Sequence, residues 1–175
     1  MNIPTTFQTV TEHFKKNAWK FQVVEGHPIL NASFRASNGT FRLVVGVDEA
    51  DDLIQVFGFV PVVVPPHKLA AVSELCVRLS QNMRMGRFEL NHSDGELRCQ
   101  TYSAYRPGEL KAEVIQRVVG ANLTLTDQNF PAFIAVIYAN VPPAEAAEQI
   151  RSRIAKGQPT GPQPEAQAPS RIILN

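Results

Sequence analysis

Apolar and polar residues alternate between Trp19 and Val60, a pattern that predicts strands with one buried face. Three breaks divide this stretch into four strands of an antiparallel meander: residues 25–28, the dipeptide Asn38-Gly39 and residues 49–52. A two-residue turn at Asn38-Gly39 would set the register between the second and third strands. The predicted pairs are Val23 with Leu30, Phe34 with Leu43, Leu30 with Val47, and Val47 with Ile54. All these registers place the apolar residues on one inner face.

Two helical patterns frame the meander. Phe7, Val10 and Phe14 recur at helical spacing and predict a short first helix. The segment from Pro65 to Gly86 predicts one long amphipathic helix, which we expect to cover the inner face of the meander. A second hairpin follows, in which Phe88 would face Cys99, Leu90 would face Leu97, and Glu89 would face Arg98.

The C-terminal third reads as three more helical segments. One opens at Gly108-Glu109 and would stop at a break over residues 127–129, before a separate buried helix at residues 130–138. Pro142-Pro143 would start a polar helix that ends at Gly157, and Pro61 should limit the fourth strand. We therefore expect a single α+β domain over residues 1–157. In it, an antiparallel sheet, built as a four-strand meander plus a second hairpin, is packed on one face by helices.

Composition and charge narrow the class of protein. A chain of 175 residues suits one domain, and its 17 basic and 16 acidic residues leave a net charge of +1. This balance lacks the excess of positive charge that nucleic-acid-binding proteins carry. The sequence contains neither a signal-peptide pattern nor an apolar run of the ~20 residues that span a bilayer. We expect a cytoplasmic protein without membrane contact.

Catalytic and metal-binding patterns are not found. The glycines form no phosphate loop, and the four histidines are scattered without ligand spacing. The acidic residues 49, 51 and 52 read as a solvated turn, and Cys76 and Cys99 as buried reduced thiols. We therefore predict no cofactor, no metal and no enzymatic activity. A catalytic site assembled from distant residues would leave no such pattern and stays open.

The outer face of the predicted meander is polar except at one end. There Val44, Phe57 and Phe59 form a candidate protein-binding surface. The alternatives are that a helix or the tail covers the rings, or that a bulge at Gly58 turns one of them inward.

A second candidate lies in the tail. Residues 158–175 are rich in proline and polar residues, and they close on Ile172, Ile173 and Leu174. These three residues form either a docking tail, which would add to a sheet edge or cover an apolar patch, or a solvated end.

The order of elements and several short motifs resemble the YbjN family of bacterial proteins. The motif residues are Val64-Pro65, Asn82, Gly86-Arg87-Phe88-Glu89-Leu90 and Asp94-Gly95-Glu96-Leu97-Arg98, and the likeness runs from Thr5 to Tyr138. The resemblance implies a fold similar to that of type III secretion chaperones, with one sheet against helices. It also implies a module that is often dimeric and binds protein without catalysis.

The resulting hypothesis is a bacterial protein-interaction module, chaperone-like or regulatory, that presents an apolar sheet surface to a partner polypeptide. We expect a homodimer and a protein partner whose identity the sequence does not give. The alternative is a small-ligand sensor or an enzyme with a pocket between sheet and helices. The predicted inner face is almost wholly apolar, which argues against that pocket.

Overall fold

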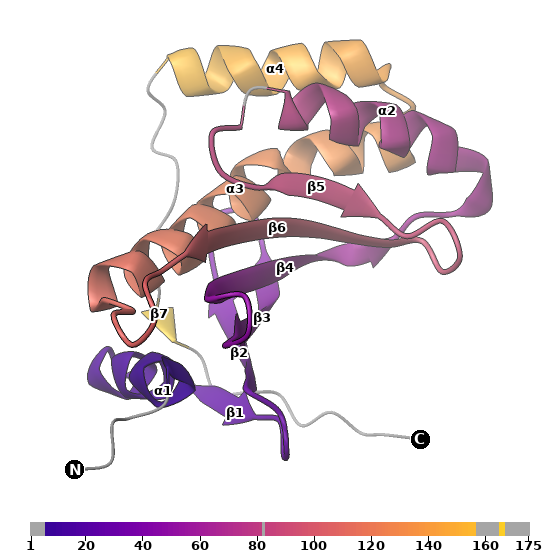
Figure 1. Ribbon diagram of the computed structural model, residues 1–175. Coiled ribbons are helices and arrows are strands. Elements are labelled where there is room, and N and C mark those ends of the chain that lie inside the picture. The colour runs from indigo at the N-terminus through magenta and orange to yellow at the C-terminus, as the bar shows by residue number, and fades with distance from the viewer. Residues whose placement is uncertain (1–5, 82, 157–164, 167–175) are drawn as a thin grey trace.

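The computed structural model describes residues 6–81, 83–156 and 165–166, which form helices and strands in a mixed order (Figure 1). The N-terminal part contains α1 (Thr6–Lys16), β1 (Phe21–Val23), β2 (Ile29–Arg35), β3 (Thr40–Asp48) and β4 (Leu53–Val63). The middle contains the short 3₁₀ helix η1 (Pro66–Lys68), α2 (Leu69–Ser80), β5 (Arg87–Leu90) and β6 (Glu96–Ala104). The remainder contains α3 (Ala112–Tyr138), α4 (Pro143–Ala155) and β7 (Glu165–Ala166).

The strands form one open antiparallel sheet in the order β1-β2-β3-β4-β6-β5, and β7 pairs with β2. The pairing of β4 with β6 joins the meander to the second hairpin. This architecture confirms the predicted α+β fold class. The registers of Val23 with Leu30, Val47 with Ile54, and Glu89 with Arg98 are confirmed as well.

The register between β2 and β3 differs from the prediction by two residues. Phe34 pairs with Phe41 and Leu30 with Val45, because the connection has four residues and is closed by a bond from Ala36 N to Gly39 O at 2.7 Å. A shift by two keeps every side chain on its face, so the apolar inner face survives the error. The expected two-residue turn fails because Asn38 is held by α3.

The helix α3 is continuous through residues 127–131, where the sequence predicted a break and a second helix. Pro131 has no N–H to donate to Asp127 O, four residues earlier. Asn38 supplies the missing donor, because its Nδ2 donates to that oxygen at 3.0 Å. Its backbone N also donates to Asp127 Oδ1 at 2.6 Å. The β2–β3 turn therefore supplies the hydrogen bond to the helix carbonyl that Pro131 leaves without a donor.

Replacing Asn38 by alanine should lower the free energy of unfolding by about 1–2 kcal/mol, because Asp127 O loses its donor. The same substitution should cost less than half as much in a Pro131→Ala background, because the backbone N–H gained at position 131 can donate to Asp127 O within the helix. Urea unfolding of the four proteins gives this coupling directly. Equal costs in both backgrounds would show that the hydrogen bond from Asn38 to Asp127 O contributes nothing to stability.

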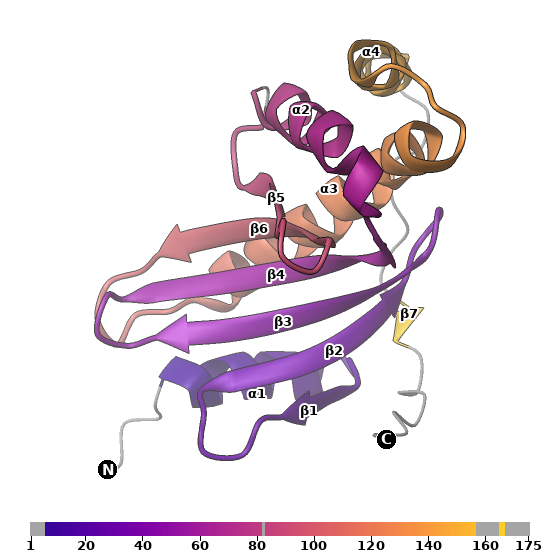
Figure 2. The same cartoon turned by 90° about the vertical axis from the view of Figure 1, so that its right-hand side faces the viewer.

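Two buried clusters fill the inner face of the sheet. The first lies under the meander and includes Trp19, Phe34, Phe41 and Ile54, as expected. Its helical cover comes from α1 and the first half of α3, not from α2 as predicted. Figure 2 shows α1 and α3 behind the strands of the meander.

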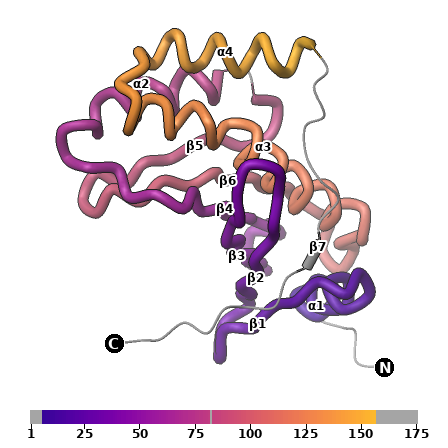
Figure 3. Tube along the Cα trace, turned by 180° about the vertical axis from the view of Figure 1, so that it is seen from behind, coloured from indigo at the N-terminus to yellow at the C-terminus, as the bar shows by residue number. Residues whose placement is uncertain are grey.

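The second cluster joins α2, α4 and the second half of α3 to β5 and β6. Helix α2 ends at Ser80, short of the predicted Gly86, and Ser80 Oγ accepts a bond from Phe88 N at 3.0 Å. The helix lies beside that edge strand and packs on α3 and α4, and it contributes no described residue to the cluster under the meander. The arrangement of α2, α3 and α4 around β5 is also visible from behind (Figure 3).

Pro61 lies inside β4, although the sequence predicted that it would limit this strand. The register between β4 and β6 shifts between Phe59 and Val63, and β3 pairs with β4 only as far as Phe59. No ladder bond is therefore required from residue 61, and the strand continues through its proline.

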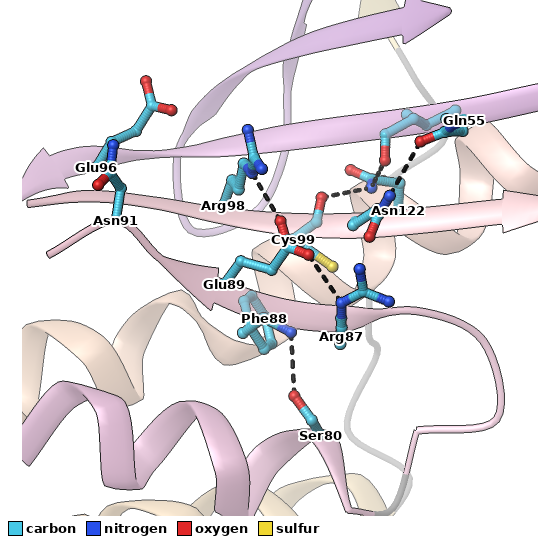
Figure 4. Close-up of polar contacts among 12 residues, drawn as sticks. Gln55, Ser80, Arg87, Phe88, Glu89, Asn91, Glu96, Arg98, Cys99 and Asn122 are labelled. Carbon is cyan, nitrogen blue, oxygen red and sulfur yellow. Dashed lines mark hydrogen bonds and ion pairs between the residues drawn. The ribbon is translucent and has the colours of Figure 1, made fainter. Parts of the chain in front are cut away.

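Helix α3 is fixed to the centre of the sheet by a buried amide. Asn122 Nδ2 donates to Val56 O on β4 and to Cys99 O on β6, each at 2.9 Å (Figure 4). Gly58 permits this approach, since a Cβ at that position would lie 2.1 Å from Asn122 Oδ1. The helix and the sheet are therefore joined by hydrogen bonds as well as by apolar packing.

Candidate functional site

The outer face of the sheet carries the candidate surface. All four α-helices contribute to the clusters on the inner face, and no described helix packs against the outer one. Strand pairing sets the outer residues in rows: Val44 lies beside Phe57, and Phe59 lies between Arg42 and Arg98. Val44, Phe57 and Phe59 are all partly exposed, so each points away from the core as predicted.

Arginine side chains lie over both rings. The Arg42 Cζ atom is 3.7 Å from the centroid of the Phe59 ring, and the Arg98 Cζ atom is 4.7 Å from that of Phe57. Such cation–π contacts contribute about 0.5–1 kcal/mol each at exposed sites. We call Val44, Phe57, Phe59, Arg42 and Arg98 the outer strip. It is an aromatic surface with positive charge above it, where the sequence predicted a purely apolar one.

The bulge that could have turned a ring inward lies elsewhere. Gly58 stays in register with Leu43 and Cys99, and the irregularity in β4 comes after Phe59. Phe57 and Phe59 therefore both face outward, and no described helix covers them.

Ion pairs extend the strip onto β5. Glu89 accepts bonds from Arg98 Nε and from Arg87 Nε, both at 2.8 Å, as Figure 4 shows. One carboxylate therefore serves two guanidinium groups. Arg42 lies 4.0 Å from the nearest carboxylate oxygen, that of Glu96. Arg87 and Arg98 together carry one positive charge more than Glu89, the carboxylate that they share.

A shallow groove of about 630 Å³ begins at one end of the strip. Its walls come from β2, β3, the end of β4 and the β5–β6 turn. We call it the outer groove, and its lining residues are Ser33, Thr40, Arg42, Phe59, Val60, Pro61, Val62, Val63, Asp94 and Glu96. The groove combines apolar walls with two carboxylates and shares Arg42 and Phe59 with the strip.

The candidate docking tail, Ile172 to Leu174, lies outside the described residues. The part of the tail that is described forms β7, which pairs with the edge of β2: Ala166 lies opposite Phe34 and Glu165 opposite Arg35. Neither the division of the chain at residue 157 nor the docking of the three apolar residues is tested by this pairing.

Buried polar groups on α3 were not expected from the sequence. Asn122 and Thr126 are buried inside the first predicted helix, and Asp127 and Asn129 are buried where a break between two helices was predicted. Their bonds run to the protein itself: Asn122 to the sheet backbone, and Thr126 Oγ1 to Asn122 O at 2.8 Å. Asn122 and Asp127 Oδ1 bond to other elements and anchor the helix, Thr126 and Asn129 bond within it, and Asp127 Oδ2 is buried without a hydrogen-bond partner among the described residues. Periodicity could not have shown the anchoring bonds, because the partners of Asn122 and Asp127 Oδ1 are on segments distant in the sequence.

The two thiols fit the prediction of buried reduced cysteines. Both are buried, and burial raises the pKa of Cys76 and of Cys99 to about 12. Thiols with such a pKa remain protonated and unreactive at neutral pH.

One serine–histidine pair is close enough to be considered as a candidate catalytic pair. Ser73 Oγ lies 2.7 Å from His92 Nε2, which joins α2 to the β5–β6 turn. A catalytic pair needs a third group that orients the histidine, and no carboxylate in the described part of the chain bonds to this ring. The pair is exposed and acts as a link between two elements.

Metal ligands are not gathered anywhere in residues 6–81, 83–156 and 165–166: no three His, Cys, Asp or Glu residues could hold an ion. No helix among these residues combines the length and hydrophobicity of a membrane span.

The fold and this face define a class: a two-layer α+β protein with helices on one side of an open sheet and a charged aromatic strip on the other. The model of the YbjN family, described as "Putative bacterial sensory transduction regulator", matches residues 6–135. This is more than half of the chain, so the chain belongs to the YbjN family, which confirms the resemblance seen in the sequence. No functionally curated protein matches it. The family description names regulation and no chemical reaction.

Proposed function

We propose that this protein is a cytoplasmic, non-catalytic regulatory module that binds a partner polypeptide on the outer strip. The observation that carries the proposal is the asymmetry of the sheet. Every described α-helix packs on the inner face, while the outer face presents two phenylalanine rings beneath guanidinium groups. Phenylalanine and arginine are both enriched at protein interfaces, and arginine is among the residue types that dominate their binding energy.

The chemistry of the strip selects the kind of partner. The rings and Val44 offer apolar area, and the excess positive charge of the arginines favours carboxylates. A segment with apolar and acidic side chains would cover the rings and pair with the guanidinium groups. The expected homodimer stays a prediction, and the strip is a poor place for it, because two copies would bring like charges together.

Changing Phe57 and Phe59 to serine should leave the fold intact and weaken partner binding at least tenfold, because both rings leave the contact surface. The partner can be sampled with displayed random peptides of about 12 residues, selected on the purified chain. We expect apolar, acidic sequences to be enriched. Fluorescence anisotropy with a selected peptide then measures the loss of affinity.

The matched control is Val77→Ser with Ile154→Ser, which removes two exposed apolar side chains on α2 and α4. It should bind the selected peptide as the parent does. Charge reversal at Arg42 and Arg98 to glutamate provides a second route, since it keeps the rings and should abolish binding of acidic peptides. Unchanged binding in both outer-face variants would refute the proposal, as would unfolding of the serine variant together with unchanged binding after charge reversal. Sedimentation of the same variants shows whether self-association uses this face.

A further inference from the structure

Strand β7 runs along the β2 edge toward a residue that lines the outer groove. Its two residues run antiparallel to β2, from the position opposite Arg35 to that opposite Phe34. The next position along this edge lies beside Ser33, which lines the groove. Beyond it the edge is already occupied, because Phe21 of β1 pairs with Ala32. Beyond Ala166, the β2 edge therefore has only the position at Ser33 between the described β7 and β1 pairings.

Only one side of the sheet is open at that point. On the inner side Phe34 is fully buried, and its ring meets Trp19 at a centroid distance of 5.4 Å. On the outer side Ser33 opens into the groove. The open surface of the sheet beside the end of β7 is therefore the outer face.

The distance suits the apolar end of the tail. Ile172 comes six residues after Ala166, which allows a reach of up to about 20 Å. Crossing from the β2 edge over β2 and β3 to β4 takes three strand spacings, or about 14 Å. The segment from Arg171 to Leu174 can therefore reach Phe59 and Val63.

We propose that residues 171–174 of the same chain occupy the outer groove and compete with the partner polypeptide. The apolar walls at Phe59 and Val63 suit Ile172, Ile173 and Leu174, and the carboxylate of Glu96 suits the guanidinium of Arg171. The inference rests on the proposed function, since the groove shares Arg42 and Phe59 with the strip. A tail seated there covers one end of the partner's surface and makes the module self-inhibited.

The first test compares the full chain with the Ile172→Ser, Ile173→Ser, Leu174→Ser variant by NMR. We expect the backbone amide signals of Ser33, Arg42, Val63 and Glu96 to shift between the two proteins. A synthetic peptide of residues 167–175, added to the variant, should return them toward their original positions. The Val77→Ser, Ile154→Ser control should leave these signals unchanged. The Val63→Ser substitution should weaken binding of the tail peptide without unfolding the chain, because Val63 is 69% exposed.

The second test measures competition. A short flexible linker gives an effective concentration of about 1 mM, so a tail with a Kd of about 100 µM would be bound roughly ten times out of eleven. The triple serine variant should therefore bind a selected acidic peptide about tenfold more tightly than the parent chain. The tail peptide should likewise bind the parent about tenfold more weakly than it binds the variant.

The outcomes separate this inference from the proposed function. Equal affinity of the selected peptide for parent and variant, with unchanged groove signals, overturns the tail proposal and leaves partner binding intact. Unchanged peptide binding in both outer-face variants overturns the proposed function, while the titration with the tail peptide still reports on the groove. Groove signals that depend on protein concentration over a roughly 20-fold range would place the tail of a second copy there and refute binding within one chain.

Discussion

Gly58→Ala should destabilise the protein by about 2–4 kcal/mol, although it adds a single methyl group. The new Cβ would lie 2.1 Å from Asn122 Oδ1 and 2.7 Å from Thr126 Oγ1. Asn122 cannot move aside without losing its bonds to Val56 O and Cys99 O. Either α3 is lifted from the sheet or a buried amide is left unpaired. Urea unfolding monitored by circular dichroism measures the loss.

Gly46→Ala is the matched control on the neighbouring strand. The nearest atom to a Cβ there is Ile29 Cγ1 at 3.8 Å, an ordinary contact, so we expect a change below about 1 kcal/mol. Asn122→Ala removes the obstacle and should make the Gly58 substitution less costly than in the parent chain. A Gly58→Ala protein as stable as the parent would show that α3 does not depend on this close approach.

Phe133→Ala should cost about 3–5 kcal/mol, the usual range for removing a large buried ring. Phe133, on α3, is fully buried in the second cluster, and its ring meets that of Phe88 at a centroid distance of 4.9 Å. The loss should appear as a fall of the melting temperature by roughly 6–20 °C. Calorimetry or fluorescence melting provides the measurement.

Tyr138→Ala tests whether the effect depends on burial. Tyr138 ends the same helix but is 65% exposed, and its loss should cost less than about 1 kcal/mol. Similar costs for both aromatic residues would mean that α2 and α4 are not held by the second cluster. That result would contradict the arrangement of the helical layer around β5.

The outer strip could be predicted only in part. Strand alternation alone placed Val44, Phe57 and Phe59 on the outer face. Arg42 could have been found as well, because the confirmed β3–β4 register puts it beside Phe59. Arg98 could not, since it reaches Phe57 only through the pairing of β4 with β6. That pairing joins segments separated by a helix, and no local pattern encodes it.

The errors in the helices have a similar origin. A proline at position 131 favours a helix start when only neighbouring residues are considered. In the folded chain the donor that compensates for it comes from Asn38, 89 residues away from the acceptor at Asp127. The same contact displaced the predicted turn at Asn38-Gly39. Two mistakes therefore have one cause, a hydrogen bond between segments that are distant in the sequence.

The sequence by itself determined the strands, their inward and outward faces and the hairpins other than the β2–β3 turn, because these depend on alternation and on turns between neighbouring residues. Only the tertiary structure decided which helix covers which part of the sheet, how α3 passes its proline and where the arginines meet the rings. Several amphipathic helices could have buried the same apolar face equally well. The choice among them was made by short connections and by specific hydrogen bonds that form only when the chain is folded.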